Sequence, residues 1–124
     1  MSGDLAWTEL PGGADCRATG RFYARVFDWA VDDDGQMVLF RTPDGRLAGA
    51  FLGELAPATT GGPMLYLATD DAHETLARAV AEGGELVLPR SMIAPGVGYR
   101  ALVRDPAGSV IGLFEALGTL GAVD

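Results

Sequence analysis

The sequence predicts an α+β fold made of two duplicated βαβββ modules. Glycine, proline and aspartate divide the 124 residues into two successive runs of strand, helix and three strands. Residues 42–51 also align without gaps on residues 105–114, with identical Pro43/Pro106, Gly45/Gly108, Gly49/Gly112 and Phe51/Phe114 pairs. A hydrophobic content of 48% is enough for one packed core and argues against a disordered chain.

The first module covers about residues 5–55. It opens with a strand at Leu5–Leu10, and Asp15 is the expected N-cap of a helix that ends near Asp28-Trp29. The apolar stripe of that helix is Ala18, Phe22, Val26 and Phe27. Two Asp-Gly pairs, which favour tight hairpins, separate three further strands. We expect these strands at 29–33, 36–42 and 46–53.

A linker rich in proline and glycine, residues 56–63, leads to the second module at about 64–117. Its first strand is expected at 64–69. Asp71 and Glu74 then form a predicted capping box at the start of a helix that Gly83-Gly84 ends. The apolar stripe of this helix is Ala72, Leu76, Ala79 and Val80. The last three strands are predicted at 85–92, 99–104 and 109–116.

Charge and composition narrow the possible partners. Seventeen acidic residues against nine arginines and no lysine give a formal net charge of -8, which argues against nucleic acid or an anionic membrane as partner. No apolar run approaches the ~18–20 residues of a membrane span. The start of the sequence lacks the basic and apolar regions of a signal peptide, so we expect a cytoplasmic protein.

Four segments together carry a family resemblance: Trp7-Thr-Glu-Leu10, Phe22-Tyr-Ala-Arg-Val-Phe-Asp-Trp29, Pro95-Gly-Val-Gly-Tyr99, and Asp105-Pro-Ala-Gly108 with Ile111-Gly-Leu-Phe114. With the duplicated βαβββ order, the chain resembles the vicinal oxygen chelate superfamily, which contains glyoxalases, bleomycin-resistance proteins and extradiol dioxygenases. The resemblance implies one domain over residues 1–124. The resemblance also implies that the two sheets form a cup around the ligand and that the helices lie on the outer face.

The resemblance also locates the positions where enzymes of this superfamily hold a divalent metal with His, Gln or Glu. They fall at Trp7 (or Thr8 in a shifted register), Gly49, Met64 and Gly112. None of these side chains is a suitable ligand, since a Met thioether prefers soft ions. We therefore predict no metal site and no cofactor. Elemental analysis of reconstituted protein checks this, and one equivalent of Zn, Ni, Fe or Mn would contradict it.

Three other features have a functional and a plainer interpretation. His73 is expected on the outside of the cup, where it cannot reach a substrate as a base. Cys16, the only cysteine, lies where a helix dipole can favour a thiolate, but partial burial beside the helix stripe is favoured. The acidic run Asp32–Asp34 indicates a solvated hairpin rather than a cation site, because its spacing does not match a calcium loop.

Glu9 shares a strand face with Trp7 and is therefore expected to point into the cup. A carboxylate there needs a partner. Two interpretations remain open, an ion pair with Arg41, Arg90 or Arg100, and a contact with a ligand. Gly49 and Gly112 are expected to leave room for that ligand, with close strand packing or a bulge as the alternative. The predicted ligand-binding residues are Trp7, Glu9, Gly49, Met64, Tyr66, Tyr99, Gly112 and Phe114.

These residues predict a metal-independent protein that binds a hydrophobic or aromatic small molecule, with a resistance or biosynthetic accessory role. One alternative is a glyoxalase-like lyase or isomerase, or a dioxygenase-like enzyme, with a non-standard site and Glu9 as the candidate catalytic base. Another is a structural module without ligand. Because the expected cup strands are apolar, a homodimer that covers them is the predicted assembly.

Overall fold

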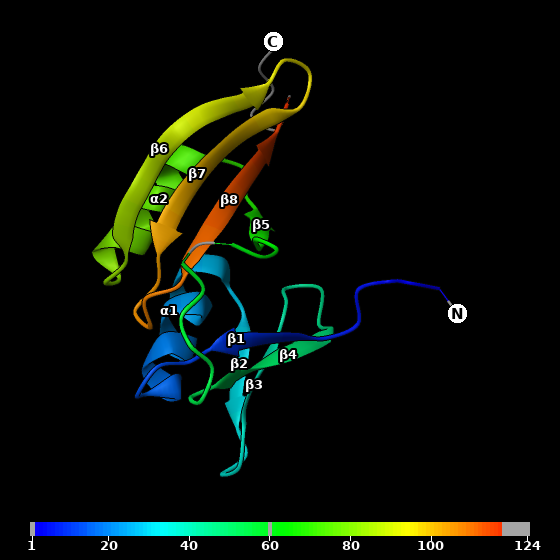
Figure 1. Cartoon of the computed structure of the whole chain (residues 1–124), viewed down its shortest axis with the longest axis vertical. Coiled ribbons are helices and arrows are strands. Elements are labelled where there is room, and N and C mark those ends of the chain that lie inside the picture. The colour runs from blue at the N-terminus through cyan, green and yellow to red at the C-terminus, as the bar shows by residue number, and fades with distance from the viewer. Residues whose placement is uncertain (1, 60, 118–124) are drawn as a thin grey trace.

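The structure is a computed structural model that describes residues 2–59 and 61–117. It contains two four-stranded mixed sheets, each with one helix on one face (Figure 1). The strand orders are β1-β4-β3-β2 and β5-β8-β7-β6, and the first strand of each module pairs in parallel with its last. The duplicated βαβββ order is therefore confirmed. The elements are β1 (Thr8–Pro11), α1 (Cys16–Phe27), β2 (Ala30–Asp33), β3 (Val38–Arg41), β4 (Leu47–Leu52), β5 (Tyr66–Ala68), α2 (Ala72–Ala81), β6 (Glu85–Ala94), β7 (Gly98–Arg104) and β8 (Val110–Ala116).

The strand β1 begins later than the sequence predicted. Its four residues pair with β4 from Thr8 opposite Gly49 to Pro11 opposite Leu52. Upstream of Thr8 the chain has no strand partner in the described part of the structure, and Leu5 is 90% exposed. Pairing with β4 therefore decides where this strand starts.

The helix α1 begins as predicted. The Asp15 carboxylate accepts hydrogen bonds from the amides of Arg17 and Ala18, at 3.1 and 3.2 Å. Asp28 ends the helix in the left-handed conformation, with φ of 60°. The buried stripe differs from the prediction in that Tyr23 is fully buried.

The predicted capping box of α2 is half formed. The Asp71 carboxylate accepts from the Glu74 amide at 3.1 Å. The Glu74 side chain does not return the bond, because it contacts Arg78 at 3.5 Å, and the Asp71 amide donates to the Thr69 hydroxyl. Val80 was predicted in the buried stripe but is 46% exposed.

One extra residue in β4 makes the two modules unequal. Phe40 of β3 pairs with Gly49, and the adjacent Arg41 pairs with Leu47, so Ala48 is a bulge. The corresponding ladder between β7 and β8 runs without a shift. Since a one-residue shift moves side chains to the opposite face, Phe51 lies in the core whereas its repeat partner Phe114 does not.

The modules meet where α1 approaches the second sheet (Figure 1). The buried Tyr23 hydroxyl donates to the Asp105 carboxylate at 2.7 Å, and Arg25 pairs with Glu82 at 3.2 Å. Burial raises the pKa of Tyr23 well above its usual value, and burial also raises the pKa of Asp105 although its hydrogen bonds oppose the shift. A single cluster of buried apolar residues extends through both modules.

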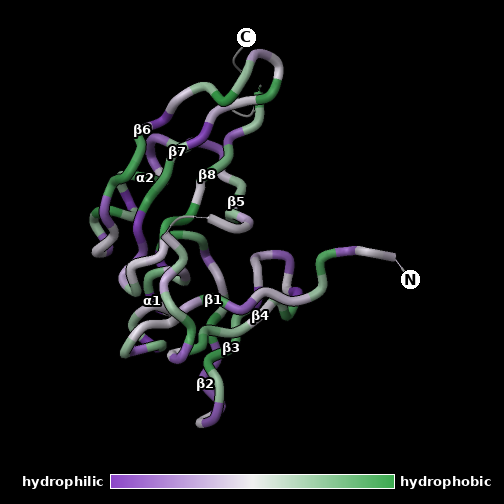
Figure 2. Tube along the Cα trace, viewed as in Figure 1, coloured by the Kyte–Doolittle hydropathy of each residue, from purple (hydrophilic) through white to green (hydrophobic). Residues whose placement is uncertain are grey.

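The hydropathy of the residues differs between the exposed hairpin tip and the second sheet. The tip of the β2–β3 hairpin is hydrophilic, whereas β6 carries hydrophobic stretches (Figure 2). Neither α1 nor α2, the helices of the described residues, is long and apolar enough to cross a membrane.

Candidate ligand-binding site

An apolar cavity of the described structure lies between β1 and the segment that leads into β5. It has a volume of 490 Å³, and Glu9 is the only charged residue in its lining. Its other lining residues are Leu5, Thr8, Leu10, Pro11, Ala58, Thr59, Gly61, Gly62, Pro63, Met64, Leu65, Ser109, Val110 and Ile111. The structure therefore brings two predicted site residues, Glu9 and Met64, to one cavity.

Trp7 lies beside this cavity. Its indole Nε1 donates to Glu9 Oε2 at 3.4 Å, and the side chain is 45% exposed. This contact confirms that Trp7 and Glu9 share a face.

Of the two interpretations of Glu9, the ion pair with Arg41, Arg90 or Arg100 is not formed in the structure. Glu9 is exposed. Each of the three candidate arginines donates to another acceptor: Arg41 to the Gly45 carbonyl, Arg90 to Glu115 and Arg100 to the Tyr66 hydroxyl. The contact of Glu9 with a ligand stays a prediction.

Tyr66, Gly112 and Phe114 form a second group, on the helix-free face of the second sheet. Tyr66 pairs with Gly112, and a Cβ atom at Gly112 would lie 2.3 Å from the Tyr66 ring. The tyrosine ring therefore rests on the glycine, so the space at Gly112 is already occupied. Phe114 pairs with Arg100 on the neighbouring strand β7.

Gly49 does not widen the cup. A Cβ atom there would lie 1.8 Å from the Thr8 carbonyl oxygen and 2.7 Å from the ring of Phe40, which belongs to the core. The bulge at Ala48 is the reason, because it turns this position toward α1. Close strand packing, the alternative interpretation, holds at Gly49, whereas at Gly112 the neighbour is the ring of Tyr66.

Tyr99 lies on the opposite face of β7 from Arg100, so the structure does not bring it together with Tyr66, Gly112 and Phe114. It pairs with the buried Glu115, and the Arg90 guanidinium lies 3.7 Å from the centre of its ring. Glu115 accepts two hydrogen bonds from Arg90, at 3.1 and 2.8 Å, and one from the Ala72 amide of α2 at 2.9 Å. Hydrogen bonding to Arg90 lowers the pKa of Glu115. The periodicity of β7 alone could have placed Tyr99 on this face.

The plainer interpretations of His73 and Cys16 agree with the structure. His73 is exposed in the first turn of α2. Cys16 is half-buried against the core at the start of α1, and a Cβ atom at Gly12 would lie 2.3 Å from its sulfur.

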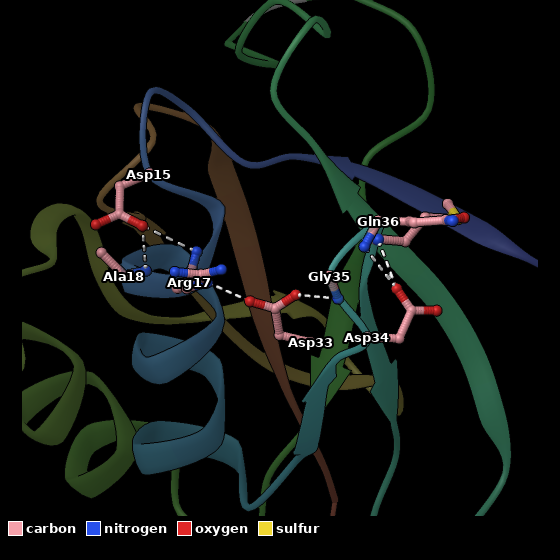
Figure 3. A network of polar contacts seen from close by, with 8 residues as sticks. Asp15, Arg17, Ala18, Asp33, Asp34, Gly35 and Gln36 are labelled. Carbon is pink, nitrogen blue, oxygen red and sulfur yellow. Dashed lines mark hydrogen bonds and ion pairs between the residues drawn. The ribbon is translucent and has the colours of Figure 1, made fainter.

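The acidic run forms a hairpin, as predicted (Figure 3). Asp33 accepts from the Gly35 amide and from the Arg17 side chain, and Asp34 accepts from the amides of Gln36 and Met37. The backbone hydrogen bonds lower the pKa of both carboxyl groups. These bonds hold the turn and anchor it to α1.

No group of three or more His, Cys, Asp or Glu side chains in residues 2–59 and 61–117 is arranged to hold a metal. The metal-free state stays a prediction that elemental analysis decides.

The paired βαβββ modules and the apolar cavity at their junction define a fold of the vicinal oxygen chelate type. A family model described as a glyoxalase-like domain matches residues 12–114. The chain belongs to this glyoxalase-like family.

Three proteins that are similar to this chain have been named or solved. CFP32 of Mycobacterium tuberculosis, which has a provisional glyoxylase name, is 28% identical over 94% of this chain and 47% of its own length. The anthracycline biosynthesis protein DnrV of Streptomyces peucetius is 29% identical over 91% of this chain and 47% of its own. The chain thus spans about half the length of these relatives. The crystal structure of TnmS3, an antibiotic binding protein from Streptomyces sp. CB03234, superposes with a TM-score of 0.70 at 20% identity, covering 94% of this chain and 98% of that one.

Proposed function

We propose that this protein binds a hydrophobic or aromatic small molecule without a metal, in a resistance or biosynthetic accessory role. The observation that carries the proposal is the 490 Å³ apolar cavity with Glu9 as its single charged lining residue. Mostly apolar walls with few polar anchors are typical of small-molecule sites. The names of TnmS3 and DnrV, which refer to antibiotic binding and anthracycline biosynthesis, support this class of ligand.

The cavity assignment predicts a role for Trp7 in binding. Stacking of an aromatic ligand contributes about 0.5–1.5 kcal/mol beyond area burial, so we expect Trp7→Ala to weaken binding roughly twofold to twelvefold. A thermal-shift screen of aromatic natural products identifies the ligand, and calorimetry measures its affinity. Met37→Ala, another partly exposed apolar side chain but in the β2–β3 hairpin region, is the matched control. An unchanged affinity in Trp7→Ala would contradict the assignment.

We also propose that the protein is a homodimer whose cups lie near the subunit interface. The support is the edge strand β6, on which Leu86, Val87, Met92 and Ile93 are 40–52% exposed. An apolar edge strand is a pairing surface unless it is covered. Light scattering at micromolar concentration is expected to give twice the chain mass of 12.9 kDa. A monomer mass would refute the dimer. The cytoplasmic location stays a prediction.

A further inference from the structure

The helix-free face of the second sheet carries an unusual arginine. Of the arginines on this sheet, Arg90 pairs with Glu115 and Arg104 with Glu85. The half-buried Arg100 makes no ion pair with a carboxylate of the described chain, and its Nη1 donates instead to the neutral Tyr66 hydroxyl at 3.1 Å. A guanidinium has five N–H donors, so this single bond leaves most of them available.

The residues next to Arg100 leave its charge uncompensated. Its cross-strand neighbours are Ser91 on β6 and Phe114 on β8, and both are uncharged. The next residue of β7 on the same face is Leu102. A half-buried positive charge in apolar surroundings interacts with an anion more strongly than an exposed one.

Tyr66 adds a flat apolar surface and a second donor. Its ring rests on the strand at Gly112, so an aromatic ligand can stack on the outer side of the ring. Since the Tyr66 oxygen accepts the bond from Arg100, its own hydroxyl proton remains available to donate. Two polar donors therefore lie beside one aromatic surface, which is the pattern that recognises a planar aromatic anion.

We propose that Arg100 and Tyr66 select ligands with an aromatic ring and an acidic oxygen, a carboxylate or phenolate, over neutral aromatic molecules. Arg100 holds the oxygen and Tyr66 provides the stacking surface and a hydrogen bond. This proposal extends the proposed small-molecule binding to the helix-free face of the second sheet. This face is distinct from the cavity beside Glu9, whose lining contains neither Arg100 nor Tyr66.

The test compares two probes of nearly equal shape, 2-naphthoate and its neutral amide 2-naphthamide, by titration calorimetry. For the unmodified protein we expect naphthoate to bind at least about tenfold tighter, in line with a charge-assisted hydrogen bond. Arg100→Gln is expected to reduce the preference to about twofold or less. Tyr66→Phe is expected to weaken naphthoate severalfold, because it removes the hydroxyl and its contact with Arg100.

Arg104→Gln is the matched control, because it removes the same charge from the same strand and face at a residue paired with Glu85. The preference must survive in this variant, and circular dichroism checks that each variant is folded. If Arg100→Gln and Arg104→Gln reduced the preference for naphthoate equally, the proposal would be overturned, since a general charge effect would then explain the preference. Equal binding of both probes by the unmodified protein would overturn the selectivity while leaving small-molecule binding intact. Failure of both probes to bind would overturn this proposal but not the proposed binding at the cavity beside Glu9.

Discussion

Replacing Gly49 with alanine is expected to cause one of the largest losses of stability of any alanine substitution in this chain. The new Cβ atom would lie 1.8 Å from the Thr8 carbonyl oxygen, so the backbones of β1 and β4 would have to separate. Overpacking costs about 1–3 kcal/mol and occasionally more. Because the neighbour here is a strand carbonyl, we expect about 3 kcal/mol, which corresponds to a fall in Tm of roughly 10 °C for a domain of this size. Thermal unfolding followed by circular dichroism measures the change.

Gly112→Ala is the natural control, because this residue occupies the repeat position of Gly49. The atoms nearest to its Cβ atom would belong to the ring of Tyr66, a half-buried side chain on the helix-free face. The ring can rotate away whereas a strand carbonyl cannot, so we expect a loss of about 1 kcal/mol. Equal stability of the two variants would contradict the claim that Gly49 and Gly112 have different environments.

Glu115→Gln is the second change with a large expected effect. The Glu115 side chain is 3% exposed, and its carboxylate accepts hydrogen bonds from Arg90 and from the backbone amide of Ala72. The neutral side chain of glutamine cannot replace the negative charge. Removing one member of a buried ion pair costs up to about 3–5 kcal/mol. Since the Arg90 side chain is 33% exposed, water compensates part of this and we expect about 2 kcal/mol. Urea unfolding at neutral pH measures it.

The exposed pair Arg104–Glu85 is the control for this experiment. Glu85 is 72% exposed, so Glu85→Gln is expected to change stability by less than about 0.5 kcal/mol. The effect of Glu115→Gln also depends on pH. The pKa of Glu115 is lowered in the fold, so its stabilising effect is present above the ordinary glutamate pKa and is lost as the pH falls through the lowered value. A difference between the parent and Glu115→Gln that does not shrink in acid would contradict this.

The sequence determined the local structure of this protein. Helix caps at Asp15 and Asp71, the Asp-Gly turn at Gly35 and the turns at Gly45 and Gly108 depend on neighbouring residues, and each formed as predicted. The repeat at a constant offset was also sufficient to predict two equal sets of elements.

The tertiary structure decided which face each site residue occupies. The repeat predicted the same environment for Gly49 and Gly112. The bulge at Ala48 turns Gly49 to the opposite face of its sheet, and a bulge depends on the pairing between strands, which the sequence alone does not specify. The partners of Arg100 and Glu115 were missed for a related reason. Tyr66 lies 34 residues from Arg100 and Arg90 lies 25 from Glu115, so only the register of the folded sheets brings these charges and donors together.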